Sequence, residues 1–313
     1  MATLSTATSN FSALVMEVVG KSAEQELRSK LVHAMPGNYL PTSFIKGTNL
    51  VRLARYADVA AVTTALTEGT TPTALALTIA SEAFSATQVG AVFELTDLSL
   101  IDSPHDLIAI NAERAGRQAA ASIDELVKTI LVAGASVQYV TATSRVLLAT
   151  SNVVTGAQVK KMVANLSRNN VPTFGDGFYR SIIHPDVVYD LFTDTATGGW
   201  MDASKYVDNT PLLNGELGRY HRVRFQETAA AFVAVDGGAA SVAAYSTIFF
   251  GPDAYTLADS QNLSSYFVPP GGDHADPLAQ IAKIGWKVRF GCILVDEAGP
   301  RYIRLESGAT LGT

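Results

Sequence analysis

The strongest hint of catalytic chemistry in the sequence lies at His184, which is followed by Pro185 and Asp186. A histidine beside a carboxylate is the arrangement from which many hydrolases build a general base. The same residues also suit the point where a strand ends and a helix begins, because proline is favoured at the first helical position. No Gly-x-Ser-x-Gly nucleophile elbow occurs in the chain. We therefore favour a structural role for His184 and keep a cytoplasmic hydrolase that uses it as an alternative.

Two further segments have residue types that bind metals or phosphates. Asp273-His274-Ala275-Asp276 has suitable metal ligands, but it lies in a loop rich in proline and glycine, and no second ligand pair accompanies it. We interpret it as a solvated surface loop. Gly20-Lys21-Ser22 matches the end of a phosphate-binding loop, but Val15 stands where that motif needs its first glycine. The sequence therefore predicts no metal and no cofactor.

The single cysteine, Cys292, lies in an apolar run from Val288 to Val295 that is typical of a strand. One cysteine cannot form an intramolecular disulfide. Because no basic residue or helix N-terminus is placed to lower the pKa of its thiol, we interpret Cys292 as a small buried hydrophobic residue. Without a nucleophile, a metal site or a cofactor site, the sequence predicts a protein that is not an enzyme.

The composition indicates a protein whose surface contacts other chains. Apolar residues make up 48% of the 313 residues and charged residues only 17%, less than the typical quarter of a soluble domain. No stretch approaches the roughly 20 apolar residues that span a bilayer, and Met1 to Asn10 does not resemble a secretory signal. We therefore expect a cytoplasmic protein without a membrane partner. The net charge of −6 means that any contact with DNA should be loose and electrostatic.

The first third of the chain is expected to consist of projections. Met1 to Met35 is typical of a loosely anchored arm, with a helical stretch around Ser22 to His33. Leu50 to Leu100 predicts a long two-stranded excursion that turns at Thr67 to Pro72. Its second half alternates, with one face formed by Val89, Ala91, Phe93 and Leu95. Because an isolated hairpin of this length is only marginally stable in water, we expect it to lie on a neighbouring chain.

The strongest helix signal follows this excursion. Ser103 is expected to cap the helix, with Pro104 at its first position and Asp106 at its third, and Gly134 is expected to end it. Thirty residues at about 1.5 Å each would form a rod of roughly 45 Å, which is long for a globular domain. Small or apolar side chains recur every three or four residues on one face, and Asp124 belongs to the opposite, polar face.

The rest of the chain predicts a mixed α+β fold. A second helix is expected between the capping residue Thr155 and Asn169-Asn170. Short strands and helices then alternate with turns, without a regular βαβ repeat. The expected strands are 178–183, 223–227, 247–250 and 284–295.

A series of short blocks between Leu66 and Lys287 has a recognisable order. The blocks are LTEGTTP (66–72), FELTDL (93–98), RNN with Pro172 (168–172), YRSIIHPDVVYDL (179–191), NGELG (214–218), RFQET (224–228), FGPDAY (250–255), DPL (276–278) and GWK (285–287). Each block alone is weak, but together and in this order they are specific. On these blocks the chain resembles the major capsid protein family of tailed double-stranded DNA phages that is typified by the N-four phage. That family is built on the Hong Kong phage capsid fold.

The resemblance implies an α+β fold with five parts. These are an N-terminal arm (1–48), an extended β-hairpin loop (49–102), a peripheral domain (103–178) whose long spine helix spans 104–133, an axial domain (179–262), and a return to the peripheral domain with the C-terminal tail (263–313).

The resemblance also implies a function in the virion. Copies of the chain would form pentamers and hexamers of an icosahedral shell, assembled in the host cytoplasm, around double-stranded DNA that is contacted loosely and without sequence preference. Portal, scaffolding and decoration proteins are further candidate partners. The loop-tip residues Glu68, Thr70 and Pro72 are the predicted inter-subunit contacts. The alternative within the structural class is the shell of a cellular nanocompartment, which has the same fold.

Two departures from the family limit what the resemblance implies. The Hong Kong phage links its subunits through an isopeptide bond between a lysine of this loop and an asparagine. Residues Tyr56 to Glu113 contain no lysine here, so we predict that no such crosslink forms. The expected arm is also too short for a built-in scaffolding domain, which implies a separate scaffolding protein or none.

Overall fold

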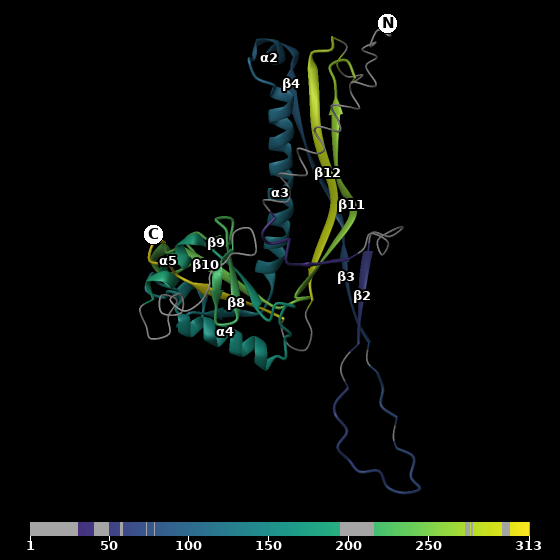
Figure 1. Ribbon diagram of the computed structural model, residues 1–313, viewed down its shortest axis with the longest axis vertical. Helices are drawn as coiled ribbons and strands as arrows, with labels where there is room; N and C mark the ends of the chain where they lie inside the picture. Colours follow the sequence, from purple (N-terminus) through teal and green to yellow (C-terminus); the bar gives the residue numbers. More distant parts are fainter. Residues whose placement is uncertain are drawn as a thin grey trace.

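The computed structural model describes residues 31–40, 50–56, 59–72, 74–77, 79–194, 216–272, 276, 278–295 and 301–312. Figure 1 shows three parts: an elongated part built on α3 and long strands, a compact part beside its lower end, and a hairpin that projects beyond both. The motif Gly20-Lys21-Ser22 lies outside the described residues, as does most of the helix predicted around Ser22 to His33. Residues 31–33 are described, and they are not helical. Among the described helices, none combines the length and the hydropathy needed to cross a membrane.

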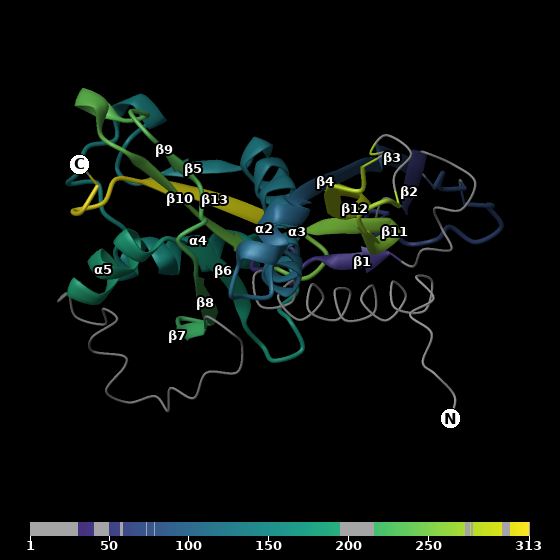
Figure 2. The same cartoon turned by 90° about the horizontal axis from the view of Figure 1, so that it is seen from above.

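The elongated part consists of one long helix against a four-stranded sheet. Helix α3 (Leu107–Ala133) runs along the long strands β4 (Thr87–Thr96), β11 (Tyr255–Val268) and β12 (Ile281–Leu294), and Figure 2 shows it to one side of the sheet. The strand order is β1-β11-β12-β4, in which β1 (Asn38–Leu40) is parallel to β11 and the other pairs are antiparallel. The shared core includes Ala115, Ala119, Ile123, Ile284, Trp286 and Val288.

Strand β4 confirms the predicted alternation but corrects the predicted pairing. Its half-buried residues Val89, Ala91, Phe93 and Leu95 pack on the core of the elongated part, and the residues between them are exposed. Its partner is β12, not the first half of the excursion. The expectation of one hairpin over Leu50–Leu100 was therefore wrong, because an alternating apolar face is buried far better against α3 than in a solvated hairpin. The hairpin that does form is shorter and joins β2 (Leu50–Tyr56) to β3 (Ile79–Ser85).

Helix α3 begins three residues later than predicted. Its N-cap is Asp106, whose carboxylate accepts hydrogen bonds from the backbone N–H groups of Ile108 and Ala109. Ser103 instead ends a short helix, α2 (Asp97–Asp102), that the sequence analysis missed and that Thr96 caps. Asp106 is the better cap because its carboxylate reaches two free N–H groups at once. The predicted end at Gly134 is confirmed.

Asp124 also departs from the prediction, because it is buried rather than on a solvated face. Its Oδ1 accepts hydrogen bonds from the backbone N–H groups of His33 (2.7 Å) and Ala34 (3.2 Å), and its Oδ2 lies 2.5 Å from His33 Nδ1. Tyr255 donates its hydroxyl to the carbonyl oxygen of His33. The segment around His33 is thus fixed to the middle of α3 by a cluster of buried polar contacts.

The compact part is an α+β unit around a seven-stranded sheet. Helices α4 (Gly156–Arg168) and α5 (Pro185–Thr193) pack on one face of this sheet through Val159, Met162, Leu166, Val187 and Leu191. Two short 3-10 helices, η2 (Arg145–Leu147) and η3 (Ala239–Ser241), complete it. The strands run in the order β5-β13-β10-β6-β8-β7, with β9 beside β10; they are β5 (Val137–Tyr139), β6 (Tyr179–Ile183), β7 (Glu216–Tyr220), β8 (Val223–Glu227), β9 (Val233–Ala234), β10 (Ala244–Phe250) and β13 (Tyr302–Ser307).

The elongated and compact parts are joined by continuous packing. Ile182, Ile248 and Phe250 of the seven-stranded sheet belong to the core of the elongated part, because they lie on the sheet face opposite α4 and α5. At the end of α3, Gly134 lies so close to the Tyr302 hydroxyl that a Cβ atom there would overlap it. The two parts therefore form one body, from which the β2–β3 hairpin projects (Figure 1).

Candidate assembly interface

His184 occupies the structural position that the sequence favoured. It is the N-cap of α5, and its Nδ1 accepts a hydrogen bond from the backbone N–H of Asp186 (3.2 Å). Burial lowers the pKa of His184, against the smaller opposing effects of Asp186 and Glu227. The ring is therefore neutral at pH 7, and the nitrogen that would act as a base is already used as the helix cap.

Beside His184, the hydroxyl of Tyr245 is the main candidate for a catalytic nucleophile. It donates a 2.7 Å hydrogen bond to Asp186 Oδ2, and burial together with this bond raises the pKa of Tyr245 to about 12. A phenol with such a pKa stays protonated and is a poor nucleophile at neutral pH. This cluster is thus a buried polar contact between α5 and β10, and it offers no support for a hydrolase.

The other candidate chemical residues have no catalytic setting. Burial raises the pKa of Cys292 to about 12, so its thiol is inert, and its predicted role as a buried hydrophobic residue on β12 is confirmed. Residues 273–275 of the predicted solvated loop lie outside the described residues. Asp276 is described, and its Oδ2 accepts a hydrogen bond from the backbone N–H of Ile281. The described residues contain no group of three His, Cys, Asp or Glu side chains that could hold a metal ion.

The projecting loop is the most exposed segment of the described chain. Between β2 and β3 it turns at Thr67–Thr70, where Thr70 N–H donates to Thr67 O and Gly69 has a φ of 80°. A type II turn requires a positive φ at its third residue, and glycine adopts this conformation without strain. The predicted contact residues Glu68, Thr70 and Pro72 are all exposed at this tip, and they belong to no strand. Their contact with another subunit stays a prediction.

Apolar side chains of this loop are exposed to an unusual degree. Leu66 is 78% exposed and Val62 is 68% exposed, and Val59, Leu75 and Leu77 are each at least half exposed. Within residues 59–77 Glu68 is the single charged side chain. An exposed run of aliphatic side chains with so little charge is typical of surfaces that contact another protein.

The base of the loop is fixed firmly to the sheet. Val51 and Phe84 of the hairpin are buried against Ala258 of β11 in a small separate core. Phe84 fits because residue 291 on β12 is glycine, where an added Cβ would lie 3.0 Å from the Phe84 ring. The hairpin therefore leaves the body in a defined direction, while its tip has no support of its own.

A groove lies on the face of the elongated sheet that α3 does not cover. It has a volume of about 600 Å³ and is lined by Gln88, Val89, Gly90, Ala91, Val92, Tyr266, Val268, Lys283, Gly285, Trp286 and Lys287. Gly90 and Gly285 leave it open, since neither has a side chain. Lys287 lies over the Tyr266 ring (4.8 Å), and Lys283 lies 3.5 Å from Glu94. The groove therefore has an apolar floor with a cation on one margin and an ion pair on the other.

Comparison with known proteins identifies this architecture. The capsid of Ralstonia phage GP4 superposes with a TM-score of 0.68 at 17% identity, covering 83% of this chain and 84% of that one. The capsid of cyanophage Pam1 gives a TM-score of 0.68 at 14% identity, covering 88% and 89%. The chain has the fold of phage capsid proteins. Residues 119–264 also match the family model of phage capsid proteins, which supports the same assignment from sequence.

The capsid fold extends beyond the structures that are described as phages. A virus-like particle from Pyrococcus furiosus gives a TM-score of 0.52 at 12% identity, covering 94% of this chain and 99% of that one. A comparison with curated protein sequences finds no significant match. The predicted Hong Kong phage capsid fold, with its α+β composition, is confirmed.

Sequence reasoning missed two features of this structure. The first is the groove, although the alternation of β4 had already placed Gly90 and Val92 together on its outer face. A glycine at an outward position of a strand is the signal that could have indicated it. The second is the buried Asp124, for which no sequence signal exists, because its partner His33 is 91 residues away.

Proposed function

We propose that this chain is the major capsid protein of a tailed double-stranded DNA phage, and that it self-assembles as pentamers and hexamers into an icosahedral shell around the genome. The capsid fold over more than four fifths of the chain carries this proposal. The exposed loop supports it, because a subunit of a shell needs apolar surface that is covered only after assembly.

The loop tip is the first candidate contact between subunits. We propose that Glu68, Thr70 and Pro72 touch a neighbouring copy, with the exposed aliphatic side chains of the loop buried there. The groove on the elongated sheet suits such an occupant, since its floor is apolar and Lys287 matches the one charge of the tip, Glu68. Contacts of this kind are heterologous, which allows the small changes of angle that a closed shell requires.

The parts of the capsid subunit follow from the same proposal. The arm would comprise residues 1–48, the extended loop 49–102, the peripheral domain 103–178, the axial domain 179–262 and the return segment 263–313. Helix α3 supports the assignment of the spine. The compact part supports a separate axial domain but not these bounds, because it also contains β5 and α4 from residues 103–178 and β13 from residues 263–313. The virion would be the final location, after assembly in the host cytoplasm, and portal, scaffolding and decoration proteins would be further partners.

A cellular nanocompartment shell is the second candidate, because the virus-like particle shares the fold. Its lower TM-score gives it less support than the phage capsids have. Electron microscopy of particles from cells that produce the protein distinguishes the two, since a phage head should be much larger than a compartment for cargo enzymes. A preparation that contains only monodisperse monomers under assembly conditions contradicts both candidates.

The finished shell should be held together without covalent bonds. Because residues 56–113 contain no lysine, no isopeptide bond can start from the loop. Boiled mature particles should therefore run as a single monomer band on a denaturing gel. A ladder of covalent oligomers would contradict this expectation.

A further inference from the structure

Three arginines lie on the face of the seven-stranded sheet opposite α4 and α5, and a fourth lies at the adjacent β7–β8 turn. Arg180 on β6 pairs in register with Arg224 on β8, which pairs in register with Arg219 on β7. Because Val223 and Phe225 on either side of Arg224 face the core beneath α4 and α5, Arg224 faces the other way. The three arginines therefore form one row across adjacent strands, and the exposed Arg222 follows at the β7–β8 turn.

Two aromatic rings contact three of these arginines. The guanidinium carbons of Arg219 and Arg224 each lie 5.4 Å from the centre of the Phe178 ring, and that of Arg180 lies 4.7 Å from the Phe174 ring. Stacking on a ring fixes the plane of a guanidinium group while its N–H groups still point outward along the edge. In the arginine site, defined as Arg180, Arg219, Arg222 and Arg224, three of the four guanidinium groups are thus positioned before any ligand arrives. Arg224 is buried, and Arg222 is the most exposed of the four.

The described residues balance the charge of the arginine site only in part. Asp176 forms a 2.9 Å ion pair with Arg224, so that four arginines and one aspartate leave a net charge of +3 over these side chains. Arg219 and Arg222 have no carboxylate partner in the part of the chain that the structure describes, and the Nε of Arg180 is buried there without an acceptor. This excess of positive charge occurs in a chain whose net charge is −6.

We propose that the arginine site binds phosphate groups of the DNA enclosed by the shell, an inference that rests on the proposed capsid function. Figure 2 shows β7 on the opposite side of the molecule from the β2–β3 hairpin, so the site and the hairpin are separate surfaces. Guanidinium groups match phosphate oxygens with paired hydrogen bonds. Phosphate contacts carry no sequence information, which suits a shell that must accept any genome sequence.

An acidic segment of a neighbouring subunit is the rival ligand. Residues 56–113 contain acidic residues but no lysine or arginine, so they could in principle meet the arginine site. Several of these carboxylates are already engaged within their own subunit. Glu94 lies 3.5 Å from Lys283, Glu113 pairs with Arg117, and Asp106 caps α3. DNA phosphate is therefore the better match.

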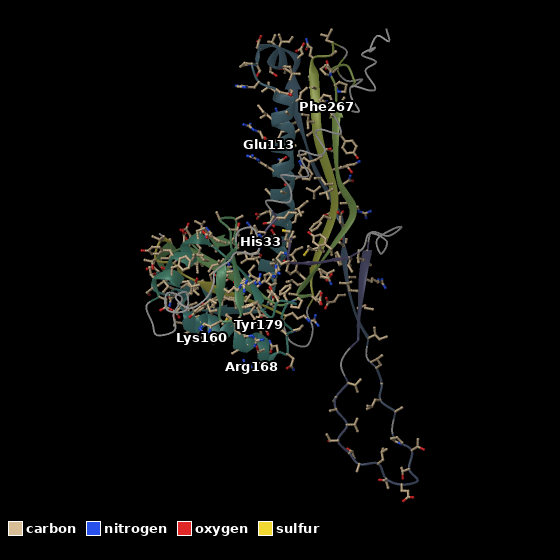
Figure 3. All side chains as sticks on the ribbon, in the orientation of Figure 1. His33, Glu113, Lys160, Arg168, Tyr179 and Phe267 are labelled. Atoms are coloured by element: carbon tan, nitrogen blue, oxygen red, sulfur yellow. The ribbon has the colours of Figure 1, made fainter. Side chains whose placement is uncertain are left out.

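The test measures binding of a short labelled DNA duplex to the unassembled full-length protein by fluorescence anisotropy, from about 50 to 200 mM salt. The variant Arg219→Gln/Arg222→Gln removes two charges from the arginine site. The matched control, Lys160→Gln/Lys161→Gln, removes two exposed charges from α4 on the other side of the same sheet, where Figure 3 shows Lys160 at the margin of the molecule.

We expect the arginine variant to weaken binding about tenfold at low salt and to reduce the slope of log affinity against log salt by about two, one per lost phosphate contact. The lysine control should stay within about twofold of the unmodified protein, because its loss of net charge is equal but lies elsewhere. Arg219→Lys/Arg222→Lys, which keeps the charge, should retain most of the slope. Equal losses in both glutamine variants, or no salt-dependent binding by the unmodified protein, would overturn the proposal.

Electron microscopy of the same proteins separates this proposal from the proposed function. If the unmodified chain forms no shells, the capsid function fails whatever the DNA measurement shows. If shells form and the glutamine variants bind DNA alike, only the arginine site fails. If Arg219→Gln/Arg222→Gln blocks shell formation without changing DNA binding, the site is a contact with another subunit and the proposal is wrong. Thermal unfolding of Arg222→Gln alone, an exposed turn residue, checks that lost binding does not reflect lost folding.

Discussion

The compact part and the projecting loop place their apolar side chains in opposite environments. Phe225, Phe249 and Leu166 of the compact part have no exposed surface, whereas Val62 and Leu66 of the loop are mostly exposed. Burial of such side chains supplies most of the stabilisation of a folded chain. The compact part obtains this stabilisation within the monomer, whereas the exposed loop would obtain it from a neighbouring subunit under the proposed function.

The contrast teaches that one chain can divide its hydrophobic free energy between folding and assembly. A mutation in the compact part should lower the free energy of unfolding of the monomer. A mutation in the loop should leave that quantity nearly unchanged and act on shell formation. The elongated part lies between these extremes, because α3 covers one face of its sheet and the groove opens on the other.

The largest effect is expected from Phe249→Ala in the compact part. Phe249 is fully buried and lies edge-on to Phe225, with ring centres 6.0 Å apart. Removing the ring should lower the free energy of unfolding by about 3–5 kcal/mol, because it takes away apolar contacts and leaves a cavity. Urea unfolding of the monomer measures this loss. A change below about 1 kcal/mol would mean that the compact part is not the stable core of the subunit.

A smaller effect is expected from Asp124→Asn. This variant tests whether the segment around His33 is stabilised within the monomer, as the compact part is. Asparagine keeps one acceptor oxygen but replaces the other, so the contact to His33 Nδ1 is lost or reversed. The free energy of unfolding should fall by about 1–3 kcal/mol. Hydrogen exchange should show faster opening of residues 31–40 while the amides of β6 and β10 stay protected. Unchanged protection at residues 31–40 would show that another contact fixes this segment.

The pH dependence of stability provides a finer test within the compact part. The folded state lowers the pKa of His184 below its usual 6.5, so below that pH the unfolded chain binds the proton more readily than the folded one. The contribution of His184 to stability is therefore complete above pH 6.5 and is lost as the pH falls through the folded pKa. His184→Asn keeps a helix cap and should flatten this decline in denaturant titrations between pH 7.5 and 5. An identical decline in the variant would assign the pH dependence to other groups.

The smallest effect on the monomer is expected from Leu66→Asp at the loop. Because Leu66 is exposed, the free energy of unfolding should change by no more than about 0.5 kcal/mol. Shell formation should nevertheless fail or slow strongly, since the charge would have to be buried at a subunit contact. Light scattering during assembly measures this, and Leu66→Met, which preserves the apolar side chain, is the control. Normal shells from Leu66→Asp would remove the loop from the list of assembly contacts.

Local signals in the sequence predicted individual elements well. The end of α3 at Gly134, the strand-to-helix transition at His184 and the alternation of β4 all depend on residues within a few positions of one another. The turn at Gly69 is of the same kind. The resemblance to phage capsid proteins added the overall architecture, because ordered blocks of sequence report on a whole fold in a way that single motifs do not.

What the sequence alone determined was therefore the type of each strong element, the absence of an obvious nucleophile, and the exposed, nearly uncharged loop. Only the tertiary structure decided which strands pair, that Asp124 is buried, and that arginines from β6, β7 and β8 share one row. These features join residues tens to hundreds of positions apart. Propensity, capping and periodicity act over a few residues, whereas pairing and burial are decided by the competition of all parts of the chain for the same core.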